Sequence, residues 1–166
     1  MRGKAVLIGA LALLASPVAA EERKAMFRNL DERVIVSPQI AAEDVAAAKA
    51  QGVTLIVNNR PDGEAPDEPQ GAEIEAAAKA AGLKYVAIPV GHGGFSAPQV
   101  DAMAAALTAT KGKTLAYCRS GTRSTLLWGL ARAKLGDAPD VLKAKANAAG
   151  YDLTPVAALL EMSRRK

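Results

Sequence analysis

The chain has 166 residues and a formal net charge of +4, with 21 Lys and Arg against 17 Asp and Glu. This length fits about one domain, and the lack of a basic run with interleaved aromatic residues argues against nucleic acid as a partner. The chain's single cysteine cannot form an internal disulfide, so in an oxidising compartment we expect it to be either buried or used in chemistry.

Residues 1–20 are typical of a secretory signal peptide. A basic start precedes an uninterrupted apolar stretch over 5–15, and small residues follow up to Ala20. The apolar stretch is shorter than the ~20 residues that a membrane span needs, which disfavours the alternative of an uncleaved anchor. We therefore predict cleavage after Ala20, a periplasmic or secreted mature protein, and no stable membrane insertion after cleavage. The folded domain is predicted over 25–163.

Beyond this segment, Ala-rich helices alternate with short apolar strands. Glycines that can take the left-handed position after a helix stand at 52, 82 and 150, and an apolar strand follows each of the first two. Strands are predicted over 34–36, 53–57, 83–88 and 114–117. Helices are predicted before Gly52, after Gly71, after Pro98, from the cysteine loop to near Gly136, and over 138–149 and 155–163.

The alternation of strands and helices predicts a single α/β domain with a mainly parallel central sheet flanked by helices on both faces. The strands are short and apolar, which fits burial on both faces of the sheet. Ligands of open α/β sheets bind beyond the carboxyl ends of the strands. Three loops leave those ends, at 58–64, 89–94 and 118–124, so we expect the lone cysteine, the lone histidine and a proline-flanked aspartate at one edge.

Cys118 is the main candidate for chemistry, because it lies where an apolar strand ends and a helix begins. Gly121 permits a tight loop there, and the backbone N–H groups at the helix start can form a cradle for an oxyanion. Arg123 adds a guanidinium fork that matches such an anion. We therefore predict a solvent-open, anion-assisted nucleophile rather than a plain core cysteine. The other predicted anion-binding residues of the loop are Arg119, Ser120, Gly121 and Thr122.

Four further candidates each have a competing structural role. Asp62 lies between a proline and a glycine, so it is either a turn residue or the general acid that protonates the leaving oxygen. Arg60 anchors Asp62, binds substrate or lies on the rim. His92, in a Gly-rich loop, either contacts substrate or is an exposed loop residue. Ser124 either donates to the cysteine sulfur or satisfies a free N–H at the helix start.

No metal site and no cofactor is predicted. One histidine and one cysteine in distant loops lack the spacing of metal ligands. The carboxylates at 64, 67 and 68 are interpreted as part of a solvated loop. The expected partner is a small anionic substrate.

Three ordered segments of the chain resemble one family, at 56–64, 81–90 and 118–128. They are similar to the phosphatase-like domain of the β-lactamase hydrolase-like proteins, over roughly residues 25–160. The resemblance implies a cysteine-phosphatase-type α/β fold in which Cys118 is the nucleophile and Arg123 clamps the phosphate. It also implies attack on phosphorus, with a cysteinyl-phosphate that water then hydrolyses.

The chain departs from the broader tyrosine-phosphatase pattern in three ways. Those enzymes place five residues between Cys and Arg, a spacing that leads here to Ser124, and they usually have His where Tyr117 stands. They carry an Asp acid on a loop that reads Gly-His-Gly-Gly here, which leaves Asp62 as the nearest substitute. The shorter loop also resembles that of rhodanese, whose cysteine carries a sulfane sulfur as a persulfide. A sulfurtransferase and a non-catalytic anion-binding module therefore stay open as alternatives to a phosphatase-like hydrolase.

Overall fold

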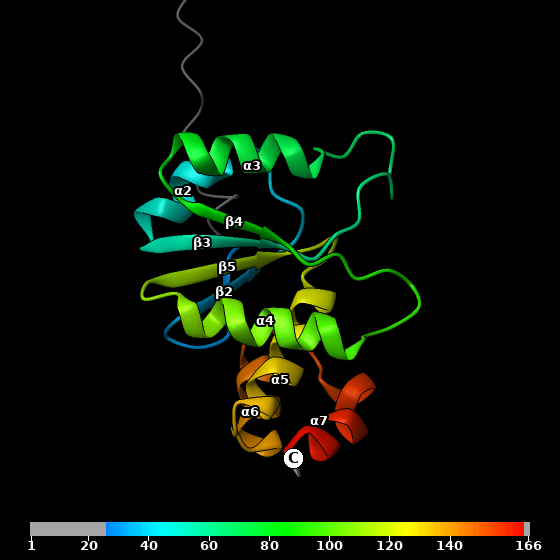
Figure 1. The fold of residues 1–166 in the computed structure, drawn as a ribbon. Helices are drawn as coiled ribbons and strands as arrows, with labels where there is room; N and C mark the ends of the chain where they lie inside the picture. The colour runs from blue at the N-terminus through cyan, green and yellow to red at the C-terminus, as the bar shows by residue number, and fades with distance from the viewer. Residues whose placement is uncertain (1–25, 165–166) are drawn as a thin grey trace, which may run out of the picture.

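The computed structural model describes residues 26–164, which form a five-stranded sheet with helices on both faces (Figure 1). The predicted signal peptide lies outside the described residues. The strands lie side by side in the order β1 (Arg28–Asn29), β2 (Val34–Ser37), β5 (Lys113–Tyr117), β3 (Val53–Asn58) and β4 (Lys84–Ala87). Only β1 pairs antiparallel with its neighbour, and the other three pairings are parallel. The predicted mainly parallel α/β sheet is therefore confirmed.

The helices divide between the two faces of the sheet (Figure 1). One face is covered by α2 (Asp44–Ala50) and α3 (Gly71–Ala80). The other is covered by α4 (Ala97–Ala109), α5 (Thr122–Lys134), α6 (Pro139–Ala148) and, after the 3₁₀ turn η1 (Thr154–Val156), α7 (Ala157–Arg164). Within residues 26–164, no helix has both the length and the apolar character needed to cross a bilayer.

Two strands differ from the prediction. β1 has only two residues, and no periodic pattern in the sequence marks it. β4 is not buried on both faces, since Lys84, Val86 and Ala87 are exposed and Tyr85 is half-buried. This follows from its place at the edge of the sheet, where β3 is its one neighbour.

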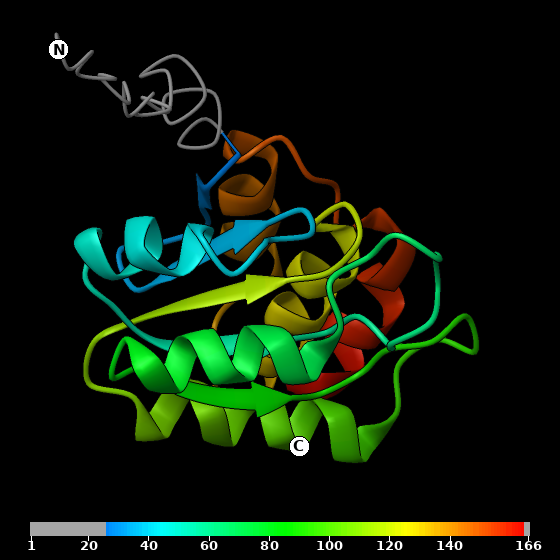
Figure 2. The same cartoon turned by 90° about the horizontal axis from the view of Figure 1, so that it is seen from above.

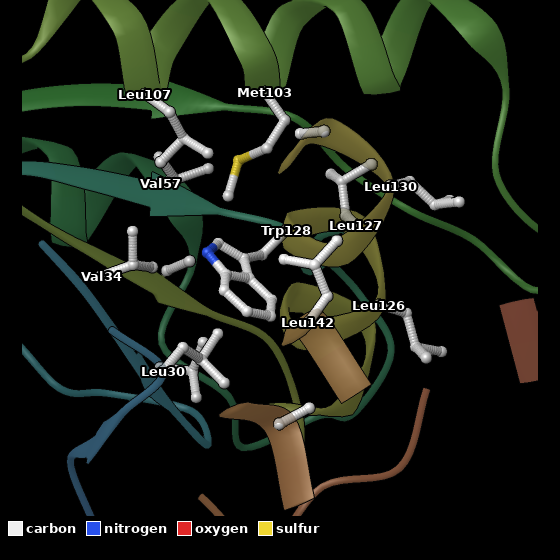
Figure 3. Packing of buried hydrophobic residues seen from close by; sticks show 14 of the residues in the cluster. Leu30, Val34, Val57, Met103, Leu107, Leu126, Leu127, Trp128, Leu130 and Leu142 are labelled. Atoms are coloured by element: carbon white, nitrogen blue, oxygen red, sulfur yellow. The ribbon is translucent and has the colours of Figure 1, made fainter. Parts of the chain in front are cut away.

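Helix α5 is buried along most of its length because it packs against the sheet, α4, α6 and α7. Its Trp128 is fully buried at the centre of the larger core, together with Val57 of β3, Met103 of α4 and Leu142 of α6 (Figure 3). Burial on this scale holds α5 firmly against the sheet. The start of α5, which follows Cys118 after a three-residue loop, is thereby fixed at the edge where the parallel strands end.

The carboxyl ends of β3, β4 and β5 meet at this edge, as predicted, and the loops that follow them gather there (Figure 2). Two asparagines at the end of β3 join the three strand ends. Asn59 donates its backbone N–H to the Tyr117 carbonyl at 2.8 Å and its side-chain amide to the Ile88 carbonyl at 3.0 Å. The Asn58 carbonyl accepts the N–H of Ile88 at 2.8 Å. The loops that carry the candidate site residues therefore start from one rigid frame.

Candidate active site

The sulfur of Cys118 lies inside the turn that leads into α5. The Cys118 backbone donates to the carbonyl of Ser37 in β2 at 3.4 Å, and its Sγ accepts the N–H of Gly121 at 3.2 Å. Gly121 has a φ of +88°, a left-handed conformation that favours glycine. Cys118 is 0% exposed, so the expectation of a solvent-open sulfur is wrong for this structure. The loop folds tightly enough to bring its own amide onto the sulfur and to close over it.

Backbone N–H groups around the start of α5 are free to bind an anion. The N–H groups of Ser120, Arg123 and Ser124 have no hydrogen-bond partner in the described part of the chain, residues 26–164. Unpaired donors are expected in the first turn of a helix, and they favour negatively charged ligands. The hydroxyl of Ser124 is fully buried and also finds no partner among these residues.

The remaining side chains of the loop form its exposed rim. Arg119 is exposed, and its carbonyl accepts the N–H of Gln39 at 3.3 Å. The Ser120 hydroxyl donates to the Thr122 hydroxyl at 3.1 Å, and both side chains are exposed. These three residues therefore lie where they were expected, but the structure gives none of them a direct contact with the sulfur.

Arg123 is held by a carboxylate that the sequence reasoning missed. Its Nη1 and Nη2 donate to the two Glu64 oxygens at 2.5 and 2.7 Å, and Nη1 also donates to the Val90 carbonyl at 2.6 Å. This pairing with Glu64 raises the pKa of Arg123, and the nearby Cys118 raises it further against the opposing effect of burial. A guanidinium has five N–H donors, of which Glu64 and Val90 take three, and Arg123 also interacts with the side chain of Cys118.

Glu64 and Glu68 belong to a buried ion-pair network, and their interpretation as solvated loop residues is wrong. Arg60 is only 7% exposed and pairs with both carboxylates, donating from Nε to Glu64 at 3.0 Å and also contacting Glu68. Its Nη1 donates to the Gln39 side chain at 2.9 Å. The hydrogen bonds from Arg123, and secondarily those from Arg60, lower the pKa of Glu64 from 4.5 to about 2 although burial opposes this. Glu64 is therefore ionised near neutral pH and cannot donate a proton.

Arg60 thus helps to hold Glu64, which in turn binds Arg123, and the structure favours this role over substrate binding. Its guanidinium is occupied by two carboxylates and an amide. Asp62 also has a structural partner, since its Oδ1 accepts the N–H of Gly71, the first residue of α3, at 2.7 Å. Of the two roles considered for Asp62, the structure favours the turn-and-capping role. His92 is exposed in the loop after β4.

Neither Asp62 nor His92 is linked to the cysteine loop by a hydrogen bond or ion pair within residues 26–164. No group of three His, Cys, Asp or Glu side chains able to hold a metal ion occurs in the same range. The described site therefore consists of a buried sulfur, unpaired amides and one arginine fork held by an ionised carboxylate.

Sequence reasoning missed Glu64 and Tyr151. A signal for the first was present, because two arginines directed to one sheet edge need counter-charges when buried. The Tyr151 hydroxyl donates to the Ser120 carbonyl at 3.2 Å, although the two residues are 31 positions apart. Nothing in the sequence pattern indicates this second contact, because it depends on how α6 packs against α5.

Comparison with known proteins shows the family to which the chain belongs. Residues 26–135 match the model of the "Beta-lactamase hydrolase-like protein, phosphatase-like domain". A β-lactamase hydrolase-like protein of Xylella fastidiosa is 33% identical over 134 residues, which cover 80% of this chain and 31% of the relative. A relative of the same name in Agrobacterium fabrum is 33% identical over 63% of this chain and 24% of its own length. The chain thus spans about a third or less of these relatives.

Solved structures confirm the phosphatase-like fold. A protein of Neisseria meningitidis, described as a candidate phosphatase, is 33% identical, with a TM-score of 0.72 over 82% of this chain and 97% of its own. PTPMT1, solved in complex with PI(5)P, is 12% identical, with a TM-score of 0.65 over 84% of this chain and 96% of its own. At that identity the likeness is one of fold. The chain is a phosphatase-like domain structurally similar to protein tyrosine and dual-specificity phosphatases.

Proposed function

The chain belongs to the phosphatase-like domain family of the β-lactamase hydrolase-like proteins, and from this premise we propose that it is a cysteine-dependent hydrolase of small phosphate esters. One observation carries the proposal: the Gly121 N–H and the guanidinium of Arg123 converge on the sulfur of Cys118. A buried sulfur with an amide and a guanidinium beside it is suited to bring a nucleophile and a dianion together.

In the proposed reaction the Cys118 thiolate attacks phosphorus. An S–P bond forms while the P–O bond to the leaving group breaks, and the phosphoryl oxygens bind the unpaired N–H groups and the guanidinium of Arg123. A water molecule then attacks phosphorus, the S–P bond breaks, and phosphate leaves with the thiolate restored. Glu64 acts as a positioning residue, because it fixes the guanidinium that interacts with Cys118.

The leaving oxygen takes its proton from water in this scheme. Glu64, with a pKa of about 2, is ionised, and Asp62 is bound to the start of α3. Catalysis without a placed acid is restricted to leaving groups that are stable as anions. Acyl phosphates and activated esters are therefore better candidate substrates than alkyl esters.

The same missing acid favours a second candidate function, sulfur transfer. The thiolate would attack the outer sulfur of a sulfane donor such as thiosulfate, forming an S–S bond while sulfite leaves with the electrons of the broken S–S bond. An acceptor such as cyanide then removes the outer sulfur as thiocyanate and restores the thiolate. Neither step needs a carboxylic acid, and the four-residue spacing between Cys118 and Arg123 gives a tight ring suited to a persulfide.

One set of assays separates these functions. The purified protein is incubated with acetyl phosphate, with 4-nitrophenyl phosphate, and with thiosulfate plus cyanide, alongside Cys118→Ser and a control on α7, Ser163→Ala. Phosphate release that Cys118→Ser abolishes and Ser163→Ala retains supports the hydrolase. Thiocyanate formation with a persulfide adduct on the cysteine supports sulfur transfer instead. Binding of tungstate without turnover in any assay refutes both and supports a non-catalytic anion-binding module.

We also propose that the protein is exported, which the basic and apolar character of residues 1–20 supports. Amino-terminal sequencing of protein recovered from a periplasmic or secreted fraction tests this. A mature start at Glu21 is expected, and an intact first residue in the membrane fraction would refute it.

A further inference from the structure

The side chain of Tyr151 lies directly on the cysteine loop. A Cβ atom built on Gly121 would come within 2.2 Å of the Tyr151 hydroxyl oxygen and 2.8 Å of its Cζ, so the phenol rests on the Gly121 backbone. The hydroxyl also donates to the Ser120 carbonyl at 3.2 Å. The N–H of the same Gly121 donates to the sulfur of Cys118, so one residue of the loop contacts both the phenol and the sulfur.

The electrostatics of the phenol agree with this placement. Burial raises the pKa of Tyr151, Arg28 opposes this effect, and the neighbouring Cys118 adds a smaller contribution in the raising direction. The contacts of the phenol with Gly121 and with the Ser120 carbonyl place it against the loop that carries the sulfur. Cys118 is 0% exposed, whereas Arg119, Ser120 and Thr122 around it are exposed. The rim of the loop is thus open to solvent while its floor is closed.

The backbone of Tyr151 is rigidly placed by the end of α6. The N–H of Gly150 donates to the Asn147 carbonyl at 2.9 Å, and the N–H of Tyr151 donates to the Ala146 carbonyl at 2.9 Å. Gly150 has a φ of +84°, so the helix ends in a Schellman motif with Tyr151 as its last member. The end of α6 therefore holds the ring of Tyr151 against the cysteine loop.

We propose that Tyr151 is a specificity-determining residue, whose ring limits the cysteine loop to small tetrahedral anions and to esters with slim leaving groups. The inference rests on the proposed use of Cys118 as a nucleophile. Acetyl phosphate and thiosulfate fit this limit, whereas an aryl ester carries its ring into the space that the phenol occupies. Arg28, beside Tyr151 and Gly150, adds a positive charge that favours an anion at the same entrance.

Alkylation of the chain's single cysteine tests the inference without any turnover, because every adduct reports on Cys118. Rate constants are measured by intact-protein mass spectrometry with iodoacetate, a small anion, and with N-phenylmaleimide, a bulky reagent. The variants are Tyr151→Ala, Tyr151→Leu and Tyr151→Phe, with Met162→Ala as a control on the exposed surface of α7. Thermal melting of each variant shows that it is folded.

Tyr151→Ala is expected to raise the ratio of the N-phenylmaleimide rate to the iodoacetate rate by about tenfold or more, the discrimination typical of a steric pocket. Tyr151→Leu raises it less, and Tyr151→Phe and Met162→Ala leave it within about twofold, because the ring rather than the hydroxyl blocks entry. An unchanged ratio in Tyr151→Ala, or a cysteine inert to both reagents in every variant, overturns the inference. If Tyr151→Ala has a lowered melting temperature, the alkylation ratio of Tyr151→Leu is used instead.

Turnover separates this inference from the proposed function. If both proposals hold, Tyr151→Ala raises the rate of 4-nitrophenyl phosphate hydrolysis relative to that of acetyl phosphate. The factor should be similar to the change in the alkylation ratio. A changed alkylation ratio without turnover on any phosphate or sulfane donor upholds the role of Tyr151 as a size filter and refutes the enzymatic function. Equal turnover of both phosphates by the unmodified protein upholds the hydrolase and overturns the size filter.

Discussion

Replacing Glu64 with glutamine removes the charge that holds Arg123 while keeping the size of the side chain. The pKa of Glu64 falls from 4.5 to about 2 in the folded protein, chiefly through its hydrogen bonds from Arg123. Each pKa unit corresponds to about 1.4 kcal/mol, so this pairing contributes about 3 kcal/mol to folding at pH 7. The Glu64 side chain is 13% exposed, so solvent screens it little. We expect Glu64→Gln to lower the free energy of unfolding by about 2–3 kcal/mol.

The pairing of Glu64 with Arg123 also determines how folding stability changes with pH. A carboxyl group whose pKa is lower in the folded than in the unfolded state stabilises the fold above its unfolded pKa. Its contribution is lost as the pH falls from about 4.5 towards 2. The difference in stability between the wild type and Glu64→Gln should therefore shrink by about 2 kcal/mol between pH 7 and pH 3.

Urea unfolding followed by fluorescence measures both quantities, because Trp128 is the chain's single tryptophan and is fully buried. The matched control is Asp67→Asn, an exposed carboxylate of the same loop, which should change stability by less than about 0.5 kcal/mol. Tungstate affinity should fall in Glu64→Gln, since Arg123 loses its anchor. A stability loss as small as that of the control, with no dependence on pH, would refute this account of Glu64.

Three further outcomes are expected. Asp62→Ala should cost about 1 kcal/mol of stability, because it removes the acceptor for the Gly71 N–H. It should leave kcat/KM unchanged, including the fall in kcat/KM at high pH that a general acid causes. Loss of that fall would identify Asp62 as the acid. Gly121→Ala should destabilise the fold by about 2 kcal/mol or more, because of the positive φ and the contact with Tyr151, and a wild-type melting temperature would contradict this. Arg123→Lys should lower kcat/KM by about a hundredfold through loss of the bidentate fork, and near-normal turnover would argue against anion clamping.

The fold could be predicted because its signals are local. Glycines at 82 and 150 end helices in the left-handed conformation, and the apolar strands alternate with Ala-rich helices, so order and topology follow from short segments. The exposed faces of β4 and the two-residue β1 could not be predicted, because they depend on which strand lies at the edge of the sheet and not on the composition of that strand.

The candidate site could be predicted in its parts but not in its connections. The loop from Cys118 to Arg123 was recognisable because glycine and a helix start have local signatures. The ion pair between Glu64 and Arg123 and the hydrogen bond from Tyr151 to Ser120 join residues 59 and 31 positions apart, and no spacing rule indicates them. The solvent-open sulfur was a wrong expectation for the same reason, since the burial of Cys118 depends on the surrounding packing.

The two arginines explain why Glu64, the carboxylate that holds Arg123, cannot serve as the acid. Arg60 and Arg123 are both largely buried, and buried guanidinium groups require counter-charges, which Glu64 and Glu68 supply. A carboxylate used in this way has its pKa driven down, as for Glu64, and so loses the ability to donate a proton near neutral pH. The network that positions Arg123 therefore excludes Glu64 from acid catalysis, which favours for Cys118 donors whose leaving group needs no proton.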